Sequence, residues 1–246
     1  MNTTLKNIFA AATLSDRGLV REDNQDSLLC LPARGFFAVA DGMGGGEGGA
    51  LASRWTCDAL EQAAGAWDGI LAALDAAHAR IVRYAEERRY RTMGTTVALV
   101  QAAADGRTAQ IAWLGDSRIY RLRAGEIERL TDDHTLGFEL SRAVAGTAAA
   151  QAVAARRHPL AHVLTRAIGV GQRPQPEIRE IELRAGDRYL ICSDGVHDLL
   201  EPEDLKEALA TAEAEAAIAA VAALVRARGA HDNFSMVCFD VREACR

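Results

Sequence analysis

Short apolar segments along the chain predict many β-strands and a smaller number of helices. Strands are expected at residues 9–15, 27–31, 36–40, 95–100, 109–114, 118–123, 127–130, 177–183, 188–192 and 234–241. Apolar positions three and four apart predict helices at 50–66, 70–88 and 213–228, and Pro202 suits the first turn of another. Because the strands come in blocks and the helices in two separate pairs, this order predicts an α+β fold, an antiparallel β-sandwich flanked by helix pairs in four αββα layers.

No internal repeat and no Pro/Ser-rich linker divides the 246 residues. We therefore expect a single domain over residues 1–246, with its core at about 13–241. Residues 134–167 depart from the regular pattern, because they are rich in Ala and His and their helical spacing is irregular.

The composition excludes several classes of protein. The formal net charge is −6, with 28 Lys and Arg against 34 Asp and Glu and no long basic run, so nucleic acid is not expected as a partner. No run of eighteen apolar residues is present, which predicts no membrane span, and the N-terminal residues do not resemble a signal peptide. Five Cys without a CxxC pair predict a reduced, cytoplasmic protein without a disulfide framework.

Candidate chemistry lies in aspartates at the ends of the predicted strands. The five residues are Asp26, Asp41, Asp116, Asp194 and Asp232. Any one of them could simply form a turn, since Asp beside Gly, Ser or Asn is common there. Five carboxylates at converging strand ends would repel one another unless cations neutralise them, and oxygen ligands suit Mg²⁺ or Mn²⁺. Two such ions at ~3.5–4 Å separation can activate water and hold a phosphoryl group.

Eight short motifs follow one another in a characteristic order. They are residues 21–26 (REDNQD), 39–45 (VADGMGG), 93–96 (MGTT), 114–118 (LGDSR), 130–135 (LTDDHT), 164–169 (LTRAIG), 192–195 (CSDG) and 232–233 (DN). Together, over about residues 15–240, they resemble the metal-dependent protein serine/threonine phosphatases of the type 2C (PPM) family in its compact bacterial form. The resemblance implies hydrolysis of phosphoserine and phosphothreonine on proteins by a metal-bridging hydroxide.

The resemblance also implies a set of roles for individual residues. Asp41 bridges two central Mn²⁺ or Mg²⁺ ions, and the Gly42 carbonyl binds one of them directly or through water. Asp194 and Asp232 hold the other ion, and Asp26 supports the site through metal-bound waters. Asp116, together with Asp194, would bind a third, weaker ion. Arg21 holds the substrate phosphate, so Arg21 and Asp41 are the expected catalytic residues.

The expected partners follow from the same resemblance. They are phosphorylated proteins, together with a cognate bacterial Ser/Thr kinase whose action a monomeric phosphatase would reverse. Two alternatives stay open: a non-catalytic member that binds phosphoproteins, and a phosphohydrolase that acts on small molecules. The first is disfavoured because every core ligand is present, whereas the metal core alone does not distinguish the second.

Several positions leave the chemistry open. Met43 stands where animal members carry a His proposed as general acid, and Gln25 stands where a carboxylate could lie. His134 could replace that acid, or it could cap or pack against the following helix. Cys192 lies near Asp194 but lacks the phosphate loop of a Cys phosphatase, so we interpret it as a buried strand residue.

In the family, residues 135–165 correspond to a flap beside the metal centre. Arg156, Arg157 and His158 in this segment could contact acidic or phosphorylated flanks of a protein substrate. The simpler interpretation is that they form the solvated face of a surface helix.

Overall fold

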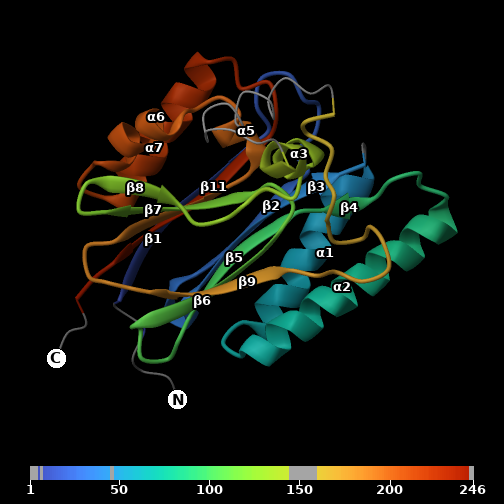
Figure 1. Cartoon of the computed structure of the whole chain (residues 1–246), viewed down its shortest axis with the longest axis horizontal. Helices are drawn as coiled ribbons and strands as arrows, with labels where there is room; N and C mark the ends of the chain where they lie inside the picture. Colours follow the sequence, from blue (N-terminus) through green and yellow to red (C-terminus); the bar gives the residue numbers. More distant parts are fainter. Residues whose placement is uncertain (1–4, 6–7, 45–46, 144–159, 244–246) are drawn as a thin grey trace.

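The strands form two antiparallel sheets that pack face to face (Figure 1). This computed structural model describes residue 5 and residues 8–44, 47–143 and 160–243. The first sheet has the order β1 (Phe9–Asp16), β11 (Phe234–Val241), β10 (Arg188–Cys192), β7 (Arg118–Arg123) and β8 (Glu126–Arg129). The second has the order β2 (Asp26–Leu31), β3 (Phe36–Met43), β5 (Val97–Ala102), β6 (Thr108–Leu114) and β9 (Glu177–Glu182), with β4 (Gly94–Thr95) paired to β3.

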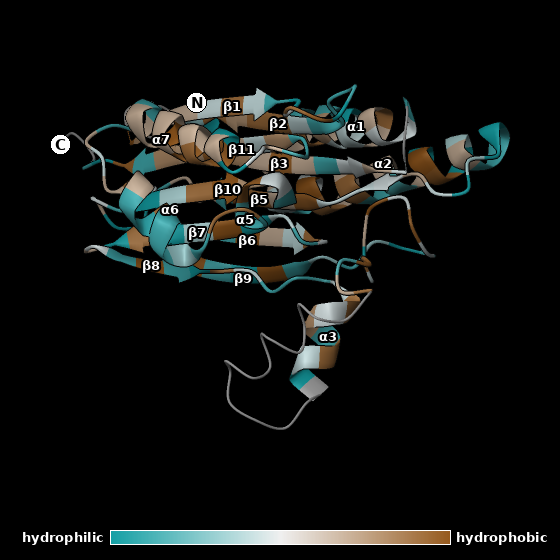
Figure 2. Cartoon of the chain, turned by 90° about the horizontal axis from the view of Figure 1, so that it is seen from above, coloured by the Kyte–Doolittle hydropathy of each residue, from teal (hydrophilic) through white to brown (hydrophobic). Residues whose placement is uncertain are grey.

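A pair of helices covers the outer face of each sheet. The helices α1 (Glu47–Ala63) and α2 (Trp67–Arg88) pack on the second sheet, and α6 (Pro202–Leu209) and α7 (Ala214–Ala227) pack on the first. The predicted α+β sandwich with flanking helix pairs is therefore confirmed. Three short helices complete the description: η1 (Pro32–Arg34), α5 (Asp194–His197) and α3 (Leu136–Ala143), which projects away from the layers (Figure 2).

Alternation along the strands explains why both faces of each sheet are buried. In β3, Phe37 and Val39 face the core between the sheets, whereas Phe36 and Ala38 face the helices α1 and α2. The rings of Phe37 and Phe239 stack across the two sheets with centroids 4.0 Å apart. The strands therefore form continuous apolar segments, and their ends carry the polar residues.

The helix boundaries differ slightly from the predicted ones. Both α1 and α2 begin three residues earlier than the predicted starts at 50 and 70. The start of α6 is as expected, because Pro202 occupies its first turn and the side chains of Glu201 and Asp204 form a capping box. No helix in the described part of the chain is long and apolar enough to cross a membrane.

Two strand boundaries beside aspartates differ from the sequence prediction. The strand β3 continues through Asp41 to Met43, beyond the predicted end at residue 40, because Gly42 and Met43 pair with Thr95 and Gly94 of β4. Asp26 is itself the first residue of β2. Of the predicted flap, α3 and residues 160–165 are described, whereas Arg156, Arg157 and His158 lie outside the described residues.

Candidate metal centre

Sheet topology brings the five aspartates to one end of the sandwich, where strands start and end. Asp26 and Asp41 are direct register partners in the β2–β3 ladder. In the first sheet, Asp116 precedes β7, Asp194 follows β10 and Asp232 precedes β11, and these three strands are neighbours in the order β11-β10-β7. Because the strands are antiparallel, their starts and ends alternate, and all three aspartates lie at the same end. We call these five residues the acidic cluster.

Burial and mutual repulsion act strongly on the acidic cluster. Burial raises the pKa of Asp41 well above its usual range, and the charges of Asp26, Asp194 and Asp116 raise it further. Burial also raises the pKa of Asp116 well above normal, with the charge of Asp194 as the next cause. The pKa of Asp194 is raised by burial as well. The carboxylates therefore lie close enough to destabilise one another when ionised.

The Asp26 carboxylate is only partly hydrogen-bonded. Its Oδ2 atom accepts a hydrogen bond from the Ser193 hydroxyl at 2.9 Å. Its buried Oδ1 atom has no hydrogen-bond partner among the described residues. Burial raises the pKa of Asp26 to about 6, although hydrogen bonds from Ser235 and Ser193 oppose the change. A buried carboxylate oxygen without a partner is costly unless a cation or water satisfies it.

The donor set suits a hard divalent cation. All five side chains offer oxygen atoms, which Mg²⁺ and Mn²⁺ prefer. Within the described ranges, however, no three His, Cys, Asp or Glu side chains form a ready-made metal site. Instead, the charges of Asp26 and Asp194 raise the pKa of Asp41. Carboxyl groups with a raised pKa release their protons when a cation binds, because metal ligands must be deprotonated. The residues therefore fit the expected cations.

Close backbone packing explains the glycine after Asp41. A Cβ atom on Gly42 would lie 2.2 Å from the carbonyl oxygen of Gly49 and 2.5 Å from that of Gln25. Only glycine allows the start of α1 and the end of the β1–β2 loop to approach this strand so closely. The Gly42 backbone thus lies beside the acidic cluster.

Arg21 faces the acidic cluster from the β1–β2 loop. Its Nη2 atom donates to Asp232 Oδ2 at 2.7 Å, while 57% of its side chain remains exposed. The hydrogen bond with Asp232 raises the pKa of the Arg21 guanidinium, and the charges of Asp194 and Asp41 add to the effect. An exposed guanidinium beside half-buried carboxylates is well placed to receive an anion from solvent.

Asn233 holds the Arg21 loop, a role that sequence reasoning missed. Its side-chain amide donates to the carbonyl oxygens of Arg17 and Asp23, each at 2.8 Å. Its Oδ1 atom accepts from the Gln25 N–H at 2.9 Å. The only signal in the sequence was the Asp-Asn pair at 232–233, which indicated the motif and not the contacts.

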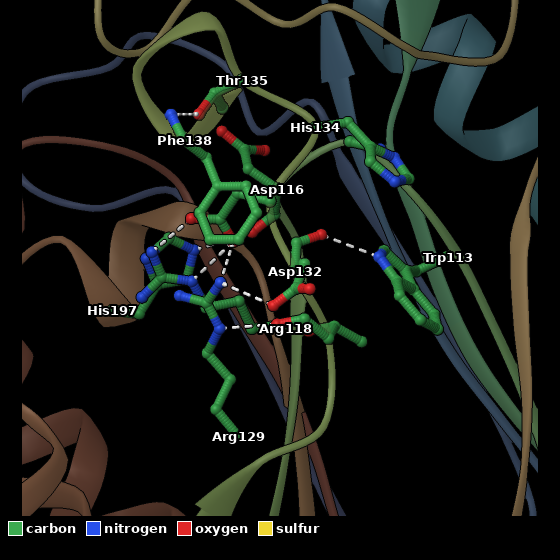
Figure 3. Close-up of polar contacts among 12 residues, drawn as sticks. Trp113, Asp116, Arg118, Arg129, Asp132, His134, Thr135, Phe138 and His197 are labelled. Carbon is green, nitrogen blue, oxygen red and sulfur yellow. Dashed lines mark hydrogen bonds and ion pairs between the residues drawn. The ribbon is translucent and has the colours of Figure 1, made fainter. Parts of the chain in front are cut away.

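Two further residues have roles that differ in kind from catalysis. His134 is buried, its Nδ1 atom accepts from the Gly115 N–H at 3.1 Å, and its Nε2 atom contacts Glu177 Oε1 at 3.2 Å. Figure 3 shows its ring beside Trp113 and away from the Asp116 carboxylate. Both ring nitrogens thus have partners away from the acidic cluster, which favours the packing alternative over the general-acid hypothesis. Cys192 is fully buried, which raises the pKa of its thiol to about 12, as expected for a structural residue.

A cavity of about 970 Å³ opens beside Asp116. We call it the α3 cavity, because α3 forms one wall and β7, β8 and the start of α6 form the others. Its lining combines apolar side chains with charged ones, among them Tyr120, Phe138, Leu200, Arg129, His197 and Asp198. Several of these residues surround Asp116 in Figure 3. The acidic cluster thus adjoins a space much larger than a phosphate group.

Comparison with known proteins agrees with this geometry. Residues 15–232 match the family model described as protein phosphatase 2C. The serine/threonine protein phosphatase PstP of Mycobacterium tuberculosis is 36% identical over 241 residues, which cover 95% of this chain but 45% of PstP. The chain therefore spans about half the length of that relative.

Solved structures share the whole fold. PppA, a regulatory component of a secretion system in Pseudomonas aeruginosa, has a TM-score of 0.86 at 30% identity, covering 96% of this chain and 98% of that one. The catalytic domain of PstP in complex with two manganese ions has a TM-score of 0.84 at 33% identity, covering 96% and 99%. The chain belongs to the protein phosphatase 2C family.

Proposed function

We propose that this chain hydrolyses phosphoserine and phosphothreonine on proteins with Mn²⁺ or Mg²⁺ bound at the acidic cluster. The observation that carries the proposal is the group of buried and half-buried, mutually repelling carboxylates at one end of the sandwich, faced by the exposed Arg21. The family supports it, and so does the relative whose catalytic domain holds two manganese ions. We further propose that residues 1–246 act as one catalytic domain.

Each member of the acidic cluster has a proposed part in holding cations. Asp41 would bridge two ions, with the adjacent Gly42 carbonyl on one of them and Asp194 and Asp232 on the other. Asp26 would act through water, since its unpartnered Oδ1 atom is available for one. Asp116 would hold a third ion together with Asp194, consistent with the electrostatic effect of Asp194 on Asp116. When bound, the cations supply Lewis-acid chemistry, which neutralises phosphate charge and activates water.

Arg21 is the proposed anchor for the substrate phosphate. A phosphomonoester carries about two negative charges at neutral pH, and a guanidinium can bind two of its oxygens at once. Arg21 contacts Asp232 with one nitrogen while most of its side chain faces solvent. Asn233 keeps the loop in place, so little ordering is needed when the phosphate arrives. Met43 stands where animal members of the family carry a histidine, and the ring of His134 lies beside Trp113. We therefore propose that a group other than these two residues protonates the leaving oxygen.

The α3 cavity is the proposed place for the polypeptide around the phosphorylated residue. It adjoins Asp116 and offers apolar walls at Tyr120, Phe138 and Leu200. A small phosphate ester would leave most of its volume unused. We therefore favour protein substrates. We also propose a cytoplasmic setting and a monomeric enzyme that reverses the action of a bacterial Ser/Thr kinase. The five Cys residues without a CxxC pair support the cytoplasmic setting.

The test is metal-dependent turnover with matched substrates. Purified protein is freed of metal, and hydrolysis of a phosphothreonine peptide is compared with that of nucleotides and sugar phosphates, with and without Mn²⁺. The proposal expects Mn²⁺-dependent turnover with a clear preference for the peptide. Faster hydrolysis of the small molecules would indicate the small-molecule alternative. Peptide binding without turnover would indicate a non-catalytic phosphoprotein-binding member.

A further inference from the structure

His134 holds the backbone of the turn that carries Asp116. The Gly115 N–H donates to His134 Nδ1 at 3.1 Å, and the His134 N–H donates to the Gly115 carbonyl at 2.9 Å. Gly115 has φ = 97°, and a Cβ atom there would lie 2.6 Å from Thr96 Cγ2. The turn is therefore fixed by Thr96 on one side and His134 on the other.

The hydrogen bonds of His134 determine its tautomer. Because Nδ1 accepts the Gly115 N–H, the ring proton must lie on Nε2, which donates to Glu177 Oε1 at 3.2 Å. Glu177 also contacts Arg166 Nη1 at 3.3 Å. Burial lowers the pKa of His134, which agrees with a neutral ring. The imidazole thus has one acceptor for Gly115 and one donor for Glu177.

His134 also lies where both ends of the flap meet the sandwich. Its carbonyl oxygen accepts from the Thr165 N–H at 2.8 Å, and the next residue, Thr135, pairs with Leu164. Its ring stacks on Trp113 with centroids 6.3 Å apart. The Trp113 indole N–H in turn donates to the Asp132 carbonyl at 2.8 Å, which fixes the segment before His134. The imidazole therefore has little freedom to move relative to Gly115.

We propose that His134 is a positioning residue that holds Asp116 in place for its cation through the Nδ1–Gly115 hydrogen bond. This inference rests on the proposed role of Asp116 in metal binding. The proposal assigns a role to one ring nitrogen, Nδ1, and that role can be tested separately from the packing of the ring. Contacts one step removed from a metal ligand typically change metal affinity by about 10–100-fold when they are lost.

The two ring nitrogens can be tested separately. In His134→Asn, the amide oxygen can take the position of Nδ1 and accept from Gly115. In His134→Gln, the longer amide reaches toward Glu177 and leaves the Gly115 N–H without its acceptor. A matched control is His78→Gln, because His78 is also buried and its Nδ1 atom accepts from the Gly169 N–H at 3.0 Å. A calorimetric titration can resolve several classes of Mn²⁺-binding site. The class that Asp116→Asn weakens is the one that depends on Asp116.

The readouts are Mn²⁺ titration calorimetry and amide hydrogen exchange of the metal-free protein. We expect His134→Gln to weaken the Asp116-dependent class about tenfold and to speed exchange of the Gly115 amide, whereas His134→Asn stays within about twofold of wild type. We expect His78→Gln to lower thermal stability without changing that class.

Three results would overturn the inference. They are wild-type Mn²⁺ affinity in His134→Gln, equal losses in His134→Asn and His134→Gln, and an equal loss in His78→Gln. Failure of the underlying function looks different. If Asp116→Asn binds Mn²⁺ as wild type does, the proposed role of Asp116 is wrong, whatever the His134 variants show.

Discussion

Asp26→Asn should stabilise the metal-free protein, although it removes a native carboxylate. Asp26 is buried, and its Oδ1 atom has no hydrogen-bond partner among the described residues. Burial raises the pKa of Asp26 from 3.8 to about 6. The folded protein therefore holds the carboxyl proton more tightly than the unfolded chain does. The cost of ionising Asp26 is absent below pH 3.8, grows as the pH rises, and is complete above pH 6.

The magnitude follows from the two pKa values. One pH unit between them corresponds to ~1.4 kcal/mol, so the ionised carboxylate destabilises the fold by about 3 kcal/mol at pH 7.5. At pH 5 only about half of this cost is present. Asparagine keeps an oxygen to accept from Ser193 and has no charge to bury. For a chain of this length, we expect the melting temperature to rise by about 6–12 °C at pH 7.5.

The assay is thermal unfolding of chelator-treated wild type and Asp26→Asn at pH 5 and pH 7.5, each repeated with Mn²⁺. The pKa values of His78 and His134 are lowered by burial, which stabilises the fold as the pH rises, but this contribution is common to both proteins and cancels. The difference between the proteins should shrink at pH 5, and Mn²⁺ should shrink or reverse it at pH 7.5. A metal-free Asp26→Asn protein less stable than wild type at pH 7.5 would refute the reasoning.

Three further predictions concern turnover. Asp41→Asn keeps the shape of the side chain but removes the charge that would hold two cations, so kcat should fall at least ~100-fold in saturating Mn²⁺, and near-normal turnover would contradict the bridging role. Arg21→Ala should mainly raise KM for a phosphopeptide, about tenfold, with a smaller change in kcat; an unchanged KM would place the phosphate elsewhere, with Arg166 or Arg118 the next to test. Chelator should abolish turnover, whereas alkylation of accessible thiols should not, because burial raises the pKa of the Cys57 and Cys192 thiols to about 12. Loss of turnover on alkylation without unfolding would make Cys192 a catalytic candidate again.

The fold could be predicted from sequence because the local patterns agree with the tertiary structure. Apolar segments such as residues 36–39 are buried on both faces, so they appear as strands in any short window. The end of β3 could not be predicted in this way. Its continuation through Asp41 and Gly42 depends on pairing with β4, some fifty residues away in the sequence, and no local pattern records that pairing.

The acidic cluster was predictable for a related reason. When neighbouring strands are antiparallel, the end of one strand lies beside the start of the next. Asp116, Asp194 and Asp232 therefore meet at the same end of the first sheet. Side-chain direction was not predictable, and His134 is the example. Its neighbours in sequence suggest the metal site, whereas its ring lies beside Trp113 because the Gly115 N–H and Glu177 offer it partners there. Asn233 shows the same limit, since its partners Arg17, Asp23 and Gln25 lie more than 200 residues away in the sequence.

The position of the acidic cluster between two sheets gives cation binding a structural consequence. Asp26 and Asp41 belong to the second sheet, whereas Asp194 and Asp232 follow and precede strands of the first. In the metal-free protein, repulsion among these carboxylates opposes the packing of one sheet against the other at this end. A cation held from both sides would convert that repulsion into an attraction across the interface. Cation binding should therefore stabilise the sandwich as a whole, because the unfolded chain cannot assemble ligands from both sheets.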